Sequence, residues 1–239
     1  MSRRADGAGS ARGKGVSLGE TIYQTLRDDI IHGALRPGAR LHLSDRAKAE
    51  GVSLSIVREA AARLASEGLL DAVPQRGFSV PELSVEDLVD LSWTRVYIET
   101  LVVREAVVHG DIAWESELVA VHHRLNATPM FDGHGGHNPE WMKLHGGFHE
   151  ALAAGCPHRR IRHLRRQLFD ASEIYRSWSG PGEQMSSITA QEHTSILEAA
   201  LARDADAAVA RATQHIEGMT RHLEDTAKRL EERGAFVTD

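Results

Sequence analysis

Histidine stands out in this sequence, because 14 of the 239 residues are histidines and only His32 and His42 precede residue 100. His145 and His149 are four residues apart in a segment with a helical pattern, so both imidazoles project from one face at a spacing that a metal ion can bridge. With a single cysteine, Cys156, the chain offers no thiolate framework. Any metal site must therefore use histidine and carboxylate ligands.

Two further histidines can complete such a site. His193 and His215 lie 22 residues apart, on two predicted helices at about 188–202 and 205–232 that form an antiparallel hairpin. They can therefore meet inside a helical bundle, where four neutral imidazoles would suit Zn²⁺, Ni²⁺ or Co²⁺ and attract an anion. The alternative is that they are ordinary solvated or hydrogen-bonded side chains. We expect solvation for the other conspicuous histidines, His122, His123, His134 and His137.

Charge divides the chain into a basic and an acidic part. Residues 1–80 carry 12 Lys and Arg against 9 Asp and Glu, a net charge of +3, and the remaining residues carry 16 against 25, a net charge of −9. Only the first part can attract nucleic acid electrostatically.

Within the basic part, residues 18–80 show the order of elements of a winged helix-turn-helix. Apolar residues recur every fourth position up to Gly33, which predicts a first helix. A short helix capped by Ser44 and a second helix capped by Ser53 follow across a tight turn. Two short strands around the turn at 74–77 then predict the hairpin, or wing.

Candidate DNA contacts lie in the second helix of this motif and in the wing. The first turns of that helix enter the major groove, and they carry Ser53, Ser55 and Arg58. Arg76 and Gly77 form the hairpin tip, which reaches a minor groove or the DNA backbone. The alternatives are that Ser53 is a helix cap and that Arg58 pairs with a neighbouring acidic residue.

Three runs, IIHGALRPGARL, GVSLSIVREAAARLASEGLL and PQRGFSV, resemble the DNA-binding domain of the GntR family of bacterial transcriptional regulators. The resemblance covers about residues 18–80. The sequence LSI stands where the family has Arg-x-Pro, so one expected DNA-contacting arginine is missing. Arg46 and Glu50 replace two core leucines, and their spacing allows them to pair with each other.

The rest of the chain has a helical pattern. Ser84 with Asp87 forms a capping box before a helix to about His109, and Asp111 caps another to about Ala127. After a loop at 129–138, helices are predicted at 139–154, 158–177, 188–202 and 205–232. We therefore expect a mainly α protein with an N-terminal winged helix-turn-helix and a C-terminal all-α bundle. The expected divisions are a disordered arm at 1–16, a DNA-binding domain at 17–80, a linker at 81–84, a helical domain at 85–228 and a tail at 229–239.

The segments WMKLHGGFHEALAAG and EHTSILEAALARDADAAVARATQHI are similar to the FCD ligand-binding domain of FadR-type GntR regulators, over about residues 85–225. This resemblance implies a divalent metal that helps to bind a small carboxylate effector. The implied ligands are His145, His149, His193 and His215. His145 stands where the family has an aspartate, so one anionic ligand is absent.

The resemblance also draws attention to Arg95 and Glu99 on the first helix of that domain. Arg95 is positioned to clamp an effector carboxylate. The alternative is an ion pair between Arg95 and Glu99, which are one helical turn apart.

The sequence thus predicts a cytoplasmic, ligand-responsive transcriptional regulator, with repression as the expected sense. It would bind a DNA operator as a homodimer and make no use of a membrane, since no apolar run is long enough to span one. The alternative is a metal-dependent hydrolase that uses the histidine cluster. It is weakened because Gly146 stands where a zinc protease helix carries its general base.

Overall fold

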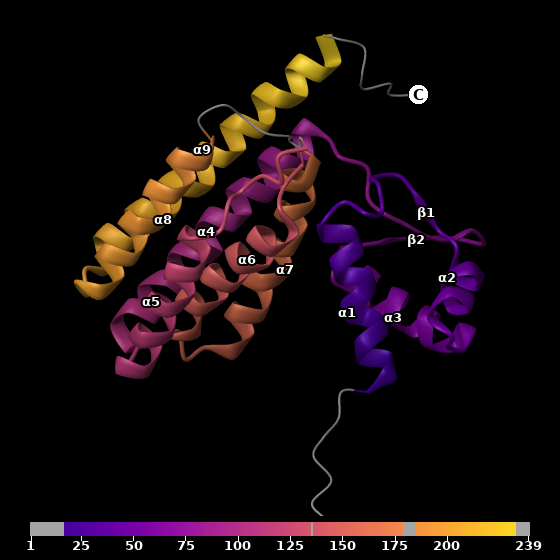
Figure 1. Cartoon of the computed structure of the whole chain (residues 1–239), viewed down its shortest axis with the longest axis horizontal. Coiled ribbons are helices and arrows are strands. Elements are labelled where there is room, and N and C mark those ends of the chain that lie inside the picture. Colours follow the sequence, from indigo (N-terminus) through magenta and orange to yellow (C-terminus); the bar gives the residue numbers. More distant parts are fainter. Residues whose placement is uncertain (1–16, 135, 179–184, 233–239) are drawn as a thin grey trace, which may run out of the picture.

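The computed structural model describes residues 17–134, 136–178 and 185–232, and its ribbon divides into a small N-terminal domain and a larger helical one (Figure 1). In the N-terminal domain, helices α1, α2 and α3 have the bounds Leu18–Ile31, Leu43–Glu50 and Leu54–Ser66. Strands β1, β2 and β3 have the bounds Arg40–Leu41, Asp71–Val73 and Gly77–Ser79. They form an antiparallel sheet in the order β1-β3-β2.

Local sequence signals explain this domain. The Ser17 hydroxyl accepts a hydrogen bond from the Glu20 backbone N–H at 3.2 Å, which caps the start of α1. The fourth-residue repeat of Ile22, Leu26 and Ile30 is buried against α3. The expected winged helix-turn-helix is therefore present.

The helical domain comprises α4 to α9, which pack lengthwise (Figure 1). Their bounds are Val85–His109, Ile112–Asn126, Pro139–Ala154, Arg159–Trp178, Met185–Leu201 and Ala205–Glu232. Side chains of Ser84, Asp111 and Asn138 accept backbone hydrogen bonds at the starts of α4, α5 and α6. The mainly α fold class is confirmed.

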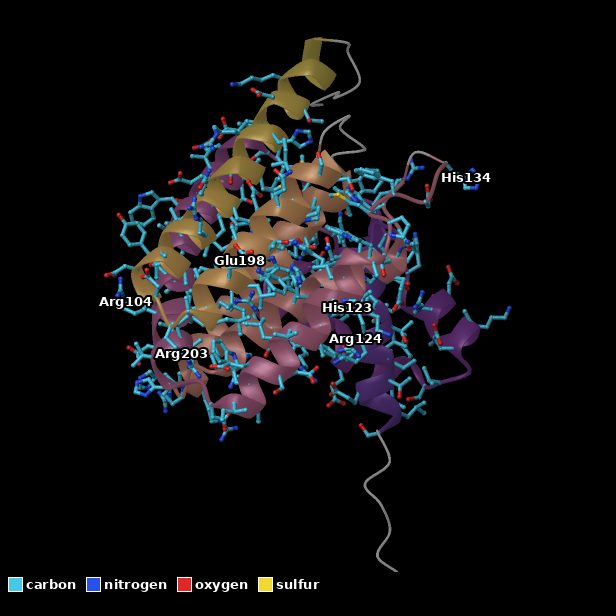
Figure 2. The ribbon with its side chains drawn as sticks, turned by 60° about the vertical axis from the view of Figure 1, so that its left-hand side comes forward. Arg104, His123, Arg124, His134, Glu198 and Arg203 are labelled. Carbon is cyan, nitrogen blue, oxygen red and sulfur yellow. The ribbon has the colours of Figure 1, made fainter. Side chains whose placement is uncertain are left out.

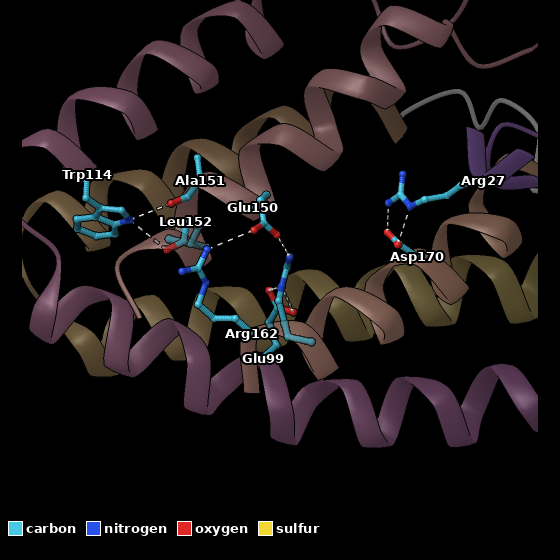
Figure 3. A network of polar contacts seen from close by, with 9 residues as sticks. Arg27, Glu99, Trp114, Glu150, Ala151, Leu152, Arg162 and Asp170 are labelled. Atoms are coloured by element: carbon cyan, nitrogen blue, oxygen red, sulfur yellow. Dashed lines mark hydrogen bonds and ion pairs between the residues drawn. The ribbon is translucent and has the colours of Figure 1, made fainter. Parts of the chain in front are cut away.

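The core of this domain lies between α4, α5, α6 and α8. Leu118, Phe148 and Ile196 are completely buried there. At its edge the Trp114 indole N–H donates to the carbonyls of Ala151 and Leu152, at 2.9 and 3.2 Å (Figure 3). These contacts hold α5 against the end of α6 and so fix the helix that carries His145 and His149.

Helix α7 joins the two domains. Its Ile174 is buried in the hydrophobic core of the N-terminal domain, and its Asp170 accepts two hydrogen bonds from Arg27 of α1 (Figure 3). The Arg27 Nε to Asp170 Oδ2 distance is 3.0 Å. The N-terminal domain is thus docked on α7 by one apolar and one charged contact.

The structure differs from the predicted starts of α2 and α8 and contains the predicted pair of Arg46 and Glu50. Ser44 is not a cap, because α2 begins at Leu43 and its cap position is His42, which makes no side-chain cap bond. Helix α8 begins three residues before the predicted position 188. Arg46 does pair with Glu50, at 3.1 Å, and it also reaches Asp29 of α1 at 2.5 Å, so this substituted position fastens α2 to α1.

Two predicted segments fall partly or wholly outside the described residues. The arm at 1–16 lies outside them, and of the tail at 229–239 the structure describes only the end of α9, to Glu232. Among the described helices, none has the length and apolar content to cross a membrane.

Candidate metal centre and DNA-binding surface

The four predicted ligand histidines meet in the interior of the helical domain. Helix α6 supplies His145 and His149, α8 supplies His193, and α9 supplies His215. All four are buried, and one nitrogen from each lies within 4.8 Å of the others. The structure therefore brings together the set that the spacing and the resemblance indicated.

The nitrogen geometry fits a metal ion. The Nε2 atoms of His145 and His149 are 3.2 Å apart, and the buried Nε2 of His193 has no hydrogen-bond partner among the described residues. Two imidazoles on a tetrahedral Zn²⁺, with Zn–N bonds of about 2.0–2.1 Å, would hold their nitrogens about 3.3 Å apart. When both Nε2 atoms present lone pairs, a cation between them would satisfy both.

Two carboxylates orient two of the four histidines. His145 Nδ1 is 3.1 Å from Glu173 Oε2, and His215 Nδ1 is 2.7 Å from Glu192 Oε2. With Nδ1–H donating to a carboxylate, each ring turns its Nε2 lone pair inward, as ligand histidines in metal proteins usually do. Arg176 donates to the other Glu173 oxygen at 2.8 Å and holds it in place.

Sequence reasoning missed both carboxylates. Glu192 was detectable, because the hairpin that pairs His193 with His215 also brings the preceding residue to that side chain. Glu173 carries no such signal. It lies on α7, a helix without a predicted ligand, and only the tertiary packing brings it to His145.

Burial keeps the cluster uncharged. Burial and nearby positive groups lower the pKa of His145, His149 and His193 well below the usual value. Burial lowers the pKa of His215 to about 3 and raises that of Glu192 to about 7. Neutral imidazole is the form that binds metal, so the ligands are in the required state at neutral pH.

Arg95 lies beside the cluster on α4. It is buried, its Nη1 donates to the Ser172 hydroxyl at 2.9 Å, and its Nε has no partner among the described residues. Burial lowers the pKa of Arg95 to about 10, so the side chain stays charged at neutral pH. Glu99 binds Arg165 instead, at 3.1 Å from its Nε, and the structure contains no Arg95–Glu99 ion pair within the described residues.

The expectation of solvation is wrong for two of the remaining histidines. His122 is buried, with its Nε2 3.3 Å from the Thr194 hydroxyl, and His137 lies between aromatic rings, where burial lowers its pKa to about 4. His123 and His134 are exposed, and His134 projects on the loop before α6 (Figure 2). In the described ranges, the four-histidine cluster is the one group of three or more suitable ligands.

The predicted DNA contacts on α3 lie at its exposed start. Ser53 occupies the cap position, yet its hydroxyl makes no cap bond and lies 2.9 Å from the Ser55 hydroxyl. Arg58 is exposed, and no acidic side chain of the described residues pairs with it. These polar groups are therefore available to an external partner.

The backbone conformation of the wing turn accounts for the glycine at position 77. Arg76 is exposed at the tip between β2 and β3, and its backbone N–H closes the turn on the Val73 carbonyl at 3.0 Å. Gln75 and Gly77 have φ angles of 61° and 92°. Glycine is suited to the second position because a side chain there would strain the backbone.

Comparisons with known proteins agree with this architecture. Residues 18–80 match the family of bacterial regulatory proteins, gntR family, and residues 90–218 match the FCD domain. The chain is 33% identical over 206 residues to the HTH-type transcriptional regulator BphR of Paraburkholderia xenovorans, covering 84% of this chain and 83% of the relative. It is 30% identical over 198 residues to the HTH-type transcriptional repressor GlaR of Escherichia coli, covering 81% and 90%.

Solved structures share the fold. McbR/YncC of E. coli superposes with a TM-score of 0.77 at 23% identity, covering 89% of this chain and 99% of that structure. A putative GntR regulator from Rhodococcus sp. RHA1 has a TM-score of 0.68 at 24% identity, covering 86% and 96%. The chain therefore belongs to the GntR family, and it is a DNA-binding transcriptional regulator with an FCD domain behind its winged helix-turn-helix.

Proposed function

We propose that this regulator senses a small carboxylate effector through a divalent metal held by His145, His149, His193 and His215. The supporting observation is the buried convergence of four neutral imidazoles, two of them oriented by carboxylates. Zn²⁺, Ni²⁺ or Co²⁺ suits this donor set. Because the ligands are neutral, the bound ion would keep its full charge and act as an electrophilic anchor for an anion.

Arg95 is the proposed second anchor for the effector. Its guanidinium is buried on α4, and its Nε lacks a partner among the described residues. A carboxylate in the bundle would satisfy this donor, which otherwise carries the cost of an unmade hydrogen bond.

At the other end of the molecule, Ser53, Ser55 and Arg58 are the proposed readers of the operator, with Arg76 at the wing. Serine hydroxyls can bond to phosphates or bases, and the Arg58 fork suits a guanine edge or a phosphate. The proposed part of Gly77 is indirect, since its left-handed backbone shapes the tip that presents Arg76.

The proposed assembly is a homodimer formed through α4. This helix carries exposed apolar side chains at fourth-residue spacing: Val89, Trp93, Tyr97 and Leu101. Trp93 and Tyr97 are 63% and 57% exposed, and their rings contact each other at 4.6 Å. A stripe of this kind on a regulator of palindromic sites fits a second copy of the chain, which would place two α3 helices about 34 Å apart.

Repression is the proposed sense of regulation, supported by the name of the E. coli relative GlaR, a transcriptional repressor. The hydrolase alternative gains no support from the site. The two carboxylates at the cluster, Glu173 and Glu192, already accept hydrogen bonds from ligand histidines, so neither is placed as a general base.

Binding to DNA from upstream of the chain's own gene tests the DNA-binding part. Fluorescence anisotropy should show affinity that falls steeply with added salt, and Arg58→Ala should weaken it about 5- to 150-fold, by about 1–3 kcal/mol. Arg124→Ala, an exposed arginine of the helical domain, is the matched control and should bind normally. Wild-type binding that is absent across the upstream region, or equal in Arg58→Ala, contradicts the proposal.

A further inference from the structure

A cleft separates the N-terminal domain from helices α6 and α7. Its volume is about 530 Å³, within the range of small-molecule sites. One wall comes from α1, with Arg27 and Ile31, and the other from α6 and α7, with Met142, Gly146 and Phe169. A ligand there would touch both domains at once.

Part of the cleft lining is apolar, and α6 contributes no side chain to it at Gly146. Ile31, Met142 and Phe169 face it from three helices. At Gly146, a Cβ atom would meet just one neighbour within 4 Å, the Phe169 ring at 3.7 Å. Side-chain volume is therefore missing from α6 where the cleft is widened.

The lining of the cleft also includes a buried arginine, Arg165. Arg165 is 1% exposed, its Nε bonds to both Glu99 oxygens at 3.1 Å, and its Nη1 reaches Glu150 at 3.4 Å. Its Nη2 is buried and has no hydrogen-bond partner among the described residues. An unmatched guanidinium donor in a cleft is suited to an anionic ligand.

The charges of the cleft lining are nearly balanced, with five acidic side chains against the four cations Arg27, Lys143, Arg165 and Arg166. Four of the lining carboxylates have an arginine within 3.5 Å: Asp28 and Asp170 share Arg27, Glu150 contacts Arg162 and Arg165, and Glu173 contacts Arg176. Glu140 is the lining acid without a cationic partner in the described residues. Lys143 and Arg166 line the cleft without an ion pair in the described residues, and the charge of Arg166 acts on Asp170 at longer range.

We propose that this cleft binds a small organic acid with an apolar body, as a site separate from the metal centre. The carboxylate would accept a hydrogen bond from Arg165 Nη2, and the body would cover Ile31, Met142 and Phe169. The Phe169 ring lines the cleft while its centroid lies 5.7 and 5.1 Å from the rings of His145 and His149. Phe169 therefore partitions the two sites.

Occupancy would act on DNA binding. Because the walls belong to α1 and to α6 and α7, a ligand in the cleft stabilises the docked arrangement of the two domains over any arrangement that separates them. The site thus gives the regulator an input that does not depend on the metal.

Calorimetric titration of chelator-treated, full-length protein tests this site. Phenylacetate and hexanoate supply a charge and an apolar body, and acetate supplies the charge alone. We expect at least one of the larger acids to bind at least about tenfold more tightly than acetate, as burial of several methylene-sized groups predicts. Gly146→Leu fills the cleft and should weaken that binding at least about tenfold.

Two further variants sharpen the test. Lys143→Gln combined with Arg166→Gln removes exposed charges without touching the core and should weaken binding several-fold. Ala120→Leu places a leucine side chain on the exposed face of α5, away from the cleft, and should bind normally. Affinity unchanged in Gly146→Leu, or no saturation by either larger acid at about 10 mM, overturns the proposal. The titration uses metal-free protein, so a failure of the metal centre leaves its outcome unaffected.

Discussion

Two histidines of the cluster, His145 and His215, each hydrogen-bond to a carboxylate, which determines which ring nitrogen faces the other histidines. Glu192 does this for His215 and Glu173 for His145, at 2.7 and 3.1 Å. Without the acceptor, the imidazole can adopt the other tautomer or rotate, and the lone pair no longer converges with its neighbours. The carboxylates are thus as much a part of the proposed centre as the nitrogens.

Glu192→Gln should lower metal affinity about 10- to 100-fold, the usual cost of losing such an outer partner, while the fold remains intact. Competition with a chromophoric chelator measures the affinity, and circular dichroism checks the fold. Glu198→Gln, on the same helix, is the control and should keep wild-type affinity. Equal affinity in Glu192→Gln would show that this carboxylate does not orient a ligand.

The neutral histidines make metal-free protein sensitive to acid. Their folded-state pKa values lie below the unfolded value of about 6.5, so the unfolded chain binds more protons and stability falls as the pH drops below about 6.5. Contributing groups are His137, His145, His149, His193 and His215. Glu192 has the opposite sign, because its pKa is raised to about 7, and it offsets one of them between about pH 7 and 4.5.

Urea unfolding of metal-free protein should therefore lose stability between pH 7 and pH 5, by up to about 1.4 kcal/mol per pH unit for each uncompensated histidine. Saturating Zn²⁺ should raise the free energy of unfolding at pH 7 above that of the metal-free protein, since it binds the folded state. A flat profile across this range would mean that the cluster is solvated and titrates normally.

The helices differ in how far their packing partners can be predicted from the sequence. Helices α6, α8 and α9 carry the ligand histidines at spacings that predict one shared interior, and the described structure has that arrangement. The caps at Ser84 and Asp111 likewise predict where α4 and α5 begin. Short-range signals of this kind are visible in one sequence because the interacting groups lie within a few residues of each other.

Long-range contacts of α7 were not predictable in the same way. Glu173 meets His145, and Asp170 meets Arg27, across 28 and 143 residues. Ile174 belongs to the helical domain, but its side chain packs in the core of the N-terminal domain. The spacing of these residues does not predict their partners, since the contact of Glu173 depends on helix packing within the helical domain and those of Asp170 and Ile174 depend on how the two domains dock.

The exposed stripe on α4 leads to a test of assembly. Sedimentation should give a mass of about 52 kDa for the wild type, twice the 26.2 kDa of the chain, and Trp93→Glu should shift it towards the monomer because charge at an apolar interface is costly. Leu164→Glu, at a 43% exposed position on α7, is the matched control and should leave the mass unchanged. A wild-type monomer, or a dimer that tolerates Trp93→Glu, excludes α4 as the interface.

Considered as a whole, the molecule places α7 between the metal cluster and the DNA-binding domain. Through Glu173 the helix contacts His145 of the histidine cluster, and through Asp170 and Ile174 it holds the winged domain. A change at either end can therefore shift the same rigid element. This gives a physical route by which the proposed effector would change operator affinity.

Asp170→Asn should loosen this docking without unfolding either domain. Removing the buried Asp170 charge leaves Arg27 with the exposed Asp28 as its remaining ion-pair partner, at a cost of up to about 3 kcal/mol, so the population with separated domains should rise by up to about a hundredfold. Cleavage after the exposed Glu82 by a glutamate-specific protease measures that population. Glu117→Gln, which removes a solvent-exposed pair with Arg124, should cleave at the wild-type rate, and equal cleavage of Asp170→Asn would contradict the docking role.

Metal analysis of untagged protein, purified without chelator, tests the central claim most directly. We predict close to one divalent metal per chain, lost in the folded His149→Ala, His193→Ala double variant and retained in His122→Ala, which removes a buried histidine outside the cluster. Folded wild-type protein that is metal-free and takes up no Zn²⁺, Ni²⁺ or Co²⁺ on titration would contradict the claim. The four histidines would then be core side chains, and effector recognition would have to rest on arginines such as Arg95.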